Sequence, residues 1–322
     1  MLGGLARRVS LVEKLKVEDT PVLVVDSGNL FTDVSGGVDH HQSLTRAKLI
    51  SRAYKRTGVA AINVGHLDLA QGLEFLRDEA SRGLPLISSN LVEPETGKPI
   101  FQPYIIKKVN KSRIAFFGLL SPPVNLNIPK TEREKFLVRD PAETARAVLA
   151  RLRGKADVII LLSALDQYSQ QEVAKTVSGI HFILGGSDGR YVPSPIWERQ
   201  TPIVESYRNG MYIGKLKLSF SDTASPFKDE GREDRIKQQI QDLDIRLRNL
   251  QEARGNYHKK FTDNAIDNIN KQRSALGDEL KVSGKVLAGD NRFSWVLIPL
   301  DNSISEDKMV AEWIRKTGIG KD

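Results

Sequence analysis

Polar side chains that could hold a metal ion or a phosphate group follow two short apolar stretches of the sequence. Asp26 and Asn29 lie in the turn after Val22–Val25, and His66 and Asp68 come soon after that, behind a second apolar stretch. Carboxylate, amide and imidazole groups bind divalent metal ions, which activate water and stabilise phosphate esters during hydrolysis. Further candidates of the same types occur elsewhere in the chain: His40, His41, Asp166 and Asp188.

Each of these side chains also has an ordinary structural interpretation. An aspartate such as Asp26 often holds a tight turn through hydrogen bonds to the backbone. A single imidazole such as His66 is more often hydrogen-bonded than metal-bound. The rings of His40 and His41 point in opposite directions if their segment is extended. Two interpretations therefore stay open: turn and loop residues, or a rebuilt metal or small-molecule site. The residues of that rebuilt site would be Asp26, Asn29, His66, Asp68 and Asp188.

The elements that would position these residues alternate between apolar strands and amphipathic helices. Short runs of Val, Ile and Leu, such as Val22–Val25 and Val158–Leu162, are typical of buried strands in an α/β sheet. Ligand sites in open α/β sheets lie beyond the carboxyl ends of the strands, where Asp26–Asn29 is expected. The alternation predicts a layered α/β domain over residues 1–221. Helices are expected over Leu5–Leu15, Leu44–Thr57, Ala70–Ala80, Asp140–Leu152 and Ser169–Val177.

The sequence pattern changes in residues 222–281. Apolar residues there recur at heptad spacing, which predicts two helices packed as an antiparallel hairpin. The first seam is Ile236, Ile240, Leu243, Leu247 and Leu250; the second is Ile266, Ile269, Leu276 and Leu280. The seam could simply bury itself, or the hairpin 229–281 could bind a protein partner. Residues 282–322 are expected to form a β-hairpin, Val282–Val286 with Phe293–Pro299, and a helix Ser305–Thr317 that packs back on the body.

Composition limits the classes of function. The chain has 322 residues, no cysteine and a net charge of +8. Disulfides, thiolate metal sites and covalently attached haem are therefore excluded within it. No apolar run reaches the roughly 20 residues of a membrane-spanning helix. The basic residues are spread along the chain rather than interleaved with aromatic residues, so no nucleic-acid partner is expected.

Several motifs occur in a fixed order: Gly3–Arg8, Asp26–Phe31, Gly65–Asp68 with Gly72–Leu76, Ala156–Ser163, and Gly179–Gly186. Together they resemble the metallophosphatase domain of the 5′-nucleotidase/UDP-sugar hydrolase family of calcineurin-like phosphoesterases, over residues 3–220. The resemblance implies a layered metallophosphoesterase-like β-sandwich flanked by helices, with the helical hairpin inserted or appended. It also implies a reaction that uses two metal ions to generate hydroxide and to bind the phosphate.

The resemblance further implies that most metal ligands have been replaced in this chain. The bridging aspartate of the family corresponds to Asn29, a neutral amide, and the catalytic histidine corresponds to Leu67. The opening strand of the family, with its D-x-H motif, is expected before Gly3. The positions of this degenerate site are Asp26, Asn29, His66, Leu67, Ala164, Ser187 and Gly189.

These observations predict a non-catalytic binding or scaffold module that uses no cofactor. Two alternatives remain: a metal-dependent phosphoesterase or 5′-nucleotidase-like hydrolase with altered ligands, and a protein that binds a nucleotide or sugar phosphate. The resemblance implies export to the bacterial periplasm or cell surface. It also implies that a c-type cytochrome domain could follow Asp322, in which case the chain would dock a redox partner.

Overall fold

The computed structural model describes residues 3–18, 21–31, 40–122, 128–186, 189, 191–207, 210–221, 225–252, 259–282 and 290–318. The chain divides into two compact units. The first comprises Met1–Lys215 and Val296–Asp322, and the second is Leu216–Trp295. Every candidate site residue named above belongs to the first unit. The predicted division at residues 221 and 281 remains a prediction.

A six-stranded sheet with the order β10-β11-β9-β8-β6-β5 forms the centre of the first unit. The four inner strands run parallel, and the edge strands β5 and β10 pair antiparallel with their neighbours. In chain order the strands are β5 (Tyr104–Val109), β6 (Ser112–Leu120), β8 (Val158–Ala164), β9 (Phe182–Gly185), β10 (Ile196–Glu198) and β11 (Thr201–Glu205). The parallel centre explains why β8 is apolar and buried along its whole length.

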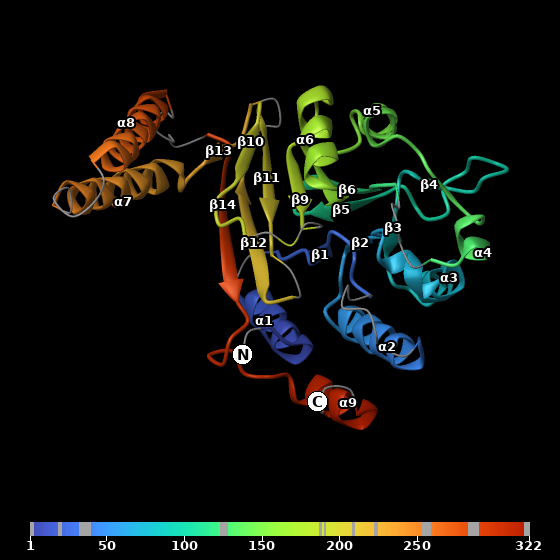
Figure 1. The fold of residues 1–322 in the computed structure, drawn as a ribbon. Coiled ribbons are helices and arrows are strands. Elements are labelled where there is room, and N and C mark those ends of the chain that lie inside the picture. The colour runs from blue at the N-terminus through green and yellow to red at the C-terminus, as the bar shows by residue number, and fades with distance from the viewer. Residues whose placement is uncertain are drawn as a thin grey trace. The chain divides into compact units, whose positions relative to one another are not determined.

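Two apolar cores lie on opposite faces of this sheet. Figure 1 shows helices on both sides of it. Phe117 and Leu161 point towards helices α5 (Pro141–Leu152) and α6 (Gln167–Thr176). Leu120 belongs to the other core. Helix α5 starts as predicted, because the Asp140 carboxylate accepts a hydrogen bond from the Glu143 amide at 2.8 Å and proline follows it.

The second core lies against a small parallel sheet with the order β1-β2-β3. Its strands are β1 (Val25–Asp26), β2 (Ala61–Asn63) and β3 (Leu86–Ile87). Helices α2 (His40–Arg56) and α3 (Leu73–Ser81) and the short 3₁₀ helix η1 (Asp68–Gln71) accompany it. The predicted buried strand Val22–Val25 was too long: the paired residues are Val25 and Asp26, and the segment is half-buried. The reason is that β1 is an edge strand, with β2 as its neighbour in this sheet.

Buried amides connect these layers. The Asn63 side chain in β2 donates hydrogen bonds to the backbone oxygens of Ser27, at 3.1 Å, and Leu119, at 2.8 Å. The Asn90 side chain donates to Leu120 O and accepts from Leu120 N. Nearby, β4 (Leu91–Val92) pairs with β7 (Leu137–Val138), and α4 (Lys130–Arg133) precedes β7. The two asparagines therefore tie the turn after β1 and the end of β6 into one framework.

Helix α9 (Lys308–Thr317) packs against α1 (Leu5–Val17) and α2. Its buried Val310 contacts a cluster that includes Ala6, Val9 and Ala53. The prediction that this helix begins at Ser305 was wrong: it begins at Lys308, because Asp307 caps it by accepting a 2.9 Å hydrogen bond from Val310 N. Both ends of the chain's described part thus contribute to the first unit.

The second unit contains two long helices, α7 (Arg232–Glu252) and α8 (Lys259–Val282), and part of a small sheet. The sheet has the order β12-β14-β13, formed by β12 (Tyr212–Ser219), β13 (Lys228–Asp229) and β14 (Arg292–Pro299). Of the predicted strand Val282–Val286, Val282 ends α8 and the other residues lie outside the described ones. Strand β14 instead pairs parallel with β13.

Candidate functional site

The turn after β1 packs closely against the turn after β2. Gly28 has a φ of 104°, and a Cβ atom there would lie 2.8 Å from both Asn63 O and Gly65 N. A Cβ on Gly65 would in turn collide with the Asn29 side chain. Only glycine fits at these two positions, so Gly28 and Gly65 have a steric reason to be glycine.

Asp68 holds the two turns together from the side of β2. Its carboxylate accepts hydrogen bonds from the backbone N–H groups of Asn29 at 2.9 Å, Gly65 at 2.8 Å and Phe31 at 2.8 Å. The side chain is buried, and this burial raises the pKa of Asp68 to about 6 although the three N–H donors act in the opposite direction. Asp68 is therefore a fixed part of the turn.

Asn29 completes the connection from the side of β1. Its Oδ1 atom accepts a 2.9 Å hydrogen bond from Leu67 N, while its own backbone N–H donates to Asp68. The residue has a φ of 59°, in the left-handed region that asparagine tolerates better than most residues. The amide oxygen that corresponds to a bridging ligand in the resemblance is thus engaged by the backbone.

The Asp26 carboxylate contacts the buried side chain of Tyr54 and the half-buried side chain of Arg8, which the sequence analysis did not predict. Its Oδ1 accepts from Gly28 N at 3.0 Å and its Oδ2 from the Tyr54 hydroxyl at 2.7 Å. Arg8 hydrogen-bonds the same hydroxyl and lies 3.7 Å from the Asp26 carboxylate. Burial raises the pKa of Tyr54 well above its usual range, so the hydroxyl stays protonated. Asp26 therefore stabilises the turn by accepting a hydrogen bond from its backbone.

The Arg8–Tyr54–Asp26 cluster could not be predicted from a local sequence pattern, because its members come from α1, α2 and β1, which lie far apart in the sequence. A signal did exist for Asn63: it is a polar residue inside the apolar stretch Val59–Val64, and in the structure it is fully buried. Polar residues inside buried strands usually have such a hydrogen-bonding reason.

The other candidates lie in different settings. His66 and Leu67 are half-buried beside the turn, and Ala164 is buried at the end of β8. Asp166 is exposed and caps α6 through Ser169 N at 2.9 Å. Gly189 is described in the loop after β9, whereas Ser187 and Asp188 lie outside the described residues. His40 and His41 begin α2 rather than an extended loop, and their side chains also lie outside the description.

A divalent metal ion takes several carboxylate, imidazole or amide groups at once. Within the part of the chain that the structure describes, no group of three or more His, Asp or Glu side chains could hold such an ion. The carboxylates nearest the turn, Asp26 and Asp68, are bound to backbone N–H groups and to Tyr54. The described residues therefore do not fit a dinuclear metal centre.

Comparison with curated proteins identifies the relatives of this chain. It is 29% identical over 163 residues to a 2′,3′-cyclic-nucleotide 2′-phosphodiesterase/3′-nucleotidase of Yersinia enterocolitica, covering 47% of this chain and 25% of the relative. It is 24% identical over 257 residues to a 5′-nucleotidase of Vibrio cholerae, covering 67% of this chain and 45% of the relative. The chain thus spans less than half the length of these relatives. No family model matches it.

Solved structures show the same fold. A sulfate thiohydrolase of Thermus thermophilus aligns with a TM-score of 0.69 at 17% identity, over 98% of this chain and 46% of that chain. A 5′-nucleotidase precursor of the same organism aligns with a TM-score of 0.65 at 18% identity, over 98% and 53%. The fold is that of the calcineurin-like phosphoesterases and 5′-nucleotidases, and the chain's homologues are 5′-nucleotidases and 2′,3′-cyclic-nucleotide phosphodiesterases. The family resemblance seen in the sequence is confirmed, whereas the replacement of its metal ligands remains a prediction.

One expectation is corrected by these relatives. They include an uncharacterized metallophosphoesterase of Bacillus subtilis, 26% identical over 208 residues, as well as the 5′-nucleotidases, and such enzymes depend on divalent metal ions. The expectation that this chain uses no cofactor is therefore wrong: divalent metal is the cofactor class of its homologues. No helix in the described ranges is both long and apolar enough to cross a membrane.

Proposed function

We propose that this chain is a binding or scaffold module with the metallophosphoesterase fold that does not hydrolyse phosphate esters. The observation that carries the proposal is the closed pair of turns. The Asn29 amide and the Asp68 carboxylate, at the carboxyl ends of β1 and β2, are both engaged by backbone N–H groups. Polar groups in these positions stabilise the frame and are not directed at a substrate.

The chemistry of the replaced positions supports the same conclusion. Hydrolysis with two metal ions needs a carboxylate that bridges them, and an acid near the leaving group. Asn29 offers a neutral amide oxygen, and Leu67 can neither donate a proton nor bind a phosphate oxygen. Ala164 likewise offers no ligand at the end of β8. A module of this kind binds through its surface or its cleft without turnover.

A phosphatase screen tests the proposal. The purified full chain is incubated with p-nitrophenyl phosphate, its bis ester, AMP and 2′,3′-cyclic AMP, in the presence of Mg²⁺, Mn²⁺, Co²⁺ or Zn²⁺. The Vibrio cholerae 5′-nucleotidase serves as the positive control. The proposal predicts no release of product above that of buffer and metal. Metal-dependent turnover that co-purifies with the folded chain would overturn it.

The alternative is a phosphoesterase with altered ligands, and the relatives favour it, since they are phosphodiesterases and nucleotidases. In that case Asn29 and the half-buried His66, which correspond to metal-ligand positions in the sequence resemblance, are the first residues to test. Turnover would then be lost in both Asn29→Ala and His66→Ala, with the folding of each variant checked by circular dichroism. Turnover that survives both substitutions would place the chemistry elsewhere.

The third possible outcome is that the chain binds a ligand without hydrolysing it. The names of the relatives suggest nucleotides as the first probes, and sugar phosphates follow from the sequence resemblance. A ligand that raises the melting temperature of the native chain and is recovered intact would define a binding protein. Substituting Asp68 would weaken that shift if the ligand binds at the two turns after β1 and β2.

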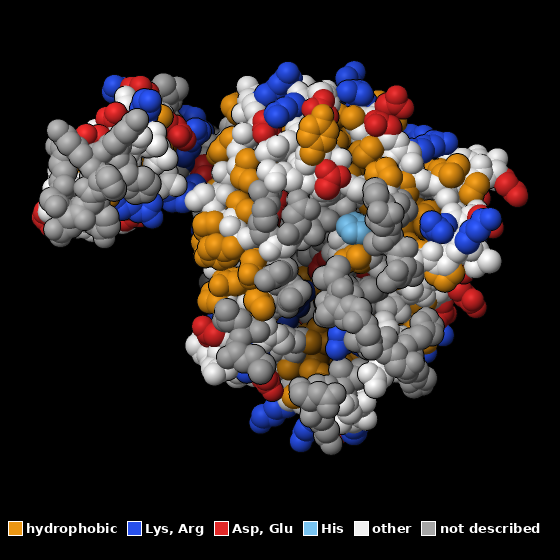
Figure 2. Space-filling model, in the orientation of Figure 1, with side chains coloured by type: hydrophobic (Ala, Val, Ile, Leu, Met, Phe, Trp, Pro, Cys, Tyr) orange, Lys and Arg blue, Asp and Glu red, His pale blue; other side chains and the backbone are white. Residues whose placement is uncertain are grey.

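We also infer that the chain acts outside the cytoplasm, in the periplasm or at the cell surface, and docks a protein partner such as a c-type cytochrome domain. The designation of one structural neighbour as a precursor supports export. Positive and negative side chains are interspersed on the face shown in Figure 2, which does not favour a nucleic acid. Fractionation of the source cells, with detection by antibody, tests the location.

A further inference from the structure

Helices α7 and α8 pack side by side and run in opposite directions. The Arg232 guanidinium at the start of α7 lies 2.9 Å from the Glu279 carboxylate near the end of α8. Asp244 and Arg273 form a second ion pair near the middle of the helices. The heptad positions Ile236 and Leu243 are buried. These contacts fix how the two helices pack against each other.

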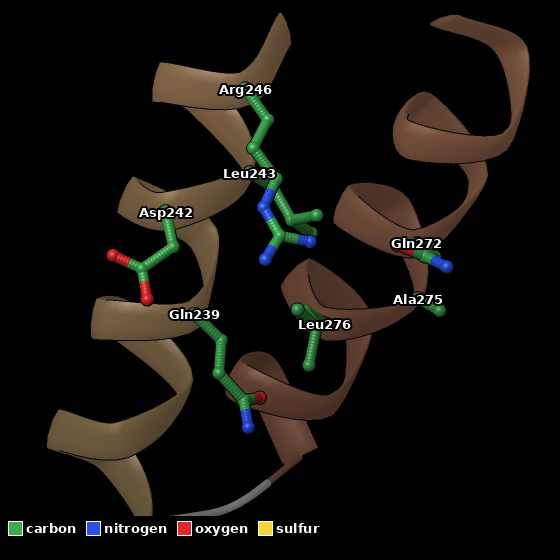
Figure 3. Close-up of a pocket in the computed structure, with 7 residues that line it drawn as sticks. All are labelled: Gln239, Asp242, Leu243, Arg246, Gln272, Ala275 and Leu276. Carbon is green, nitrogen blue, oxygen red and sulfur yellow. The ribbon is translucent and has the colours of Figure 1, made fainter. Parts of the chain in front are cut away.

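A shallow groove of about 450 Å³ runs along one side of this pair. Its apolar part consists of Leu243, Ala275 and Leu276, and its polar part includes Gln239, Asp242 and Arg246. Figure 3 shows Gln239 and Arg246 reaching towards the space between the helices, whereas Asp242 points away from α8. The groove thus offers an apolar floor with one acid and one base at its α7 border.

The charges on α7 balance. Its basic residues are Arg232, Arg235, Lys237, Arg246 and Arg248, and its acidic residues are Glu233, Asp234, Asp242, Asp244 and Glu252. Five of each give a net charge of zero, whereas the whole chain carries +8. Two copies of a basic chain repel each other least where such a neutral surface meets its like.

Ile245 adds an apolar contact beside the charged pair. Its side chain is 54% exposed, which is unusual for isoleucine on a helix that already buries its heptad seam. It lies next in sequence to Arg246, and Asp242 precedes Arg246 by one helical turn. An acid and a base four residues apart on one helix are complementary to the same pair on an antiparallel copy.

We propose that this face of α7 and α8 binds a second copy of the chain across a two-fold axis. With the axis near Asp244, Asp242 meets Arg246 of the second copy, and Arg246 meets Asp242 of the second copy. The same register brings the exposed Ile245 next to Ile245 of the second copy across the axis. Such an isologous contact uses the same residues twice, as closed dimers do, and forms a four-helix bundle.

Charge reversal tests this register in the full chain. Asp242→Arg places two arginines opposite each other at each ion pair, and Arg246→Asp places two aspartates there. Each variant is expected to weaken dimerisation at least about tenfold, because like charges face each other twice. The double variant Asp242→Arg/Arg246→Asp restores the pairs and the dimer. Sedimentation velocity over a concentration series measures all four proteins.

A mixture gives the sharpest result. When the Asp242→Arg and Arg246→Asp variants are mixed in equal amounts, both ion pairs are complementary, so two weakly associating proteins should form a heterodimer. Arg248→Asp is the matched control, because it changes the same charge on the other side of α7 and should leave the dimer intact. A wild-type chain that stays monomeric, or a mixture that fails to associate, would overturn the proposal.

Discussion

At the scale of single residues, the candidate site consists of side chains that stabilise two turns. Asn29 and Asp68 link the backbone after β1 to the backbone after β2, and Asp26 accepts a hydrogen bond from the Tyr54 hydroxyl. The sequence was sufficient to find these turns, because glycine and apolar runs mark them. It could not show Arg8 and Tyr54 beside Asp26, since contacts between distant segments leave no local pattern.

Asn29 provides the first prediction. Asn29→Ala should lower the free energy of unfolding by about 2 kcal/mol, from one lost hydrogen bond and from the left-handed backbone. Asn29→Gly should cost only about 1 kcal/mol, because glycine adopts this conformation freely. Urea unfolding of both variants measures the difference. Equal losses in the two variants would contradict a role of backbone strain at this position.

Asp68 provides the second prediction. In Asp68→Asn, an amide N–H₂ group replaces an oxygen that now accepts hydrogen bonds from backbone N–H groups. The donors that face the replaced oxygen are left without an acceptor, so the variant should lose about 2–3 kcal/mol of stability. Asp78→Asn is the matched control: its carboxylate forms an exposed ion pair with Arg82, and its loss should cost less than about 1 kcal/mol. Similar losses in both variants would show that Asp68 does not hold the turns.

At the scale of elements, local pattern decided how well the sequence predicted the fold. Helix α5 and strand β8 were anticipated because a proline cap and an unbroken apolar run are local signals. The interruption between η1 and α3 was missed, although Gly72, with a φ of 83°, stands at the break. Strand β13 was missed because two residues that pair with β14 carry no recognisable pattern.

The contact between α2 and α3 gives a prediction on pH. Burial acts to raise the pKa of Glu79 in α3, but hydrogen bonds from Lys55 and Ser51 outweigh it and leave the pKa below its usual 4.5. The stabilisation is therefore present at neutral pH and is lost as the pH falls below about 4.5 through the folded-state pKa. Glu79→Gln should cost about 1–2 kcal/mol at pH 7.

The pH profile distinguishes this charge effect from simple packing. The difference in unfolding free energy between the wild type and Glu79→Gln should shrink as the pH falls from 5 to 3, measured by urea unfolding at each pH. A difference that stays constant over this range would mean that ionisation of Glu79 does not contribute.

At the scale of the whole molecule, the chain combines a phosphoesterase framework with a second unit built around α7 and α8. The framework was recognisable from the order of its motifs, and homologous nucleotidases confirm it. The expectation of no cofactor, drawn from the sequence alone, was wrong, since the homologues depend on divalent metal. In this chain the polar groups of Asn29 and Asp68 at the strand ends are hydrogen-bonded to its own backbone.

Product release from AMP and from bis-p-nitrophenyl phosphate, with Mn²⁺ supplied, tests the central claim most directly. Loss of a single transition-state stabiliser typically lowers the rate by about 10²–10³-fold. If several ligand positions are replaced, as we propose, the chain should be at least about 10³-fold slower than an equal amount of the Vibrio cholerae 5′-nucleotidase. Metal-dependent turnover near that of the nucleotidase, abolished by Asn29→Ala and by His66→Ala, would contradict the claim.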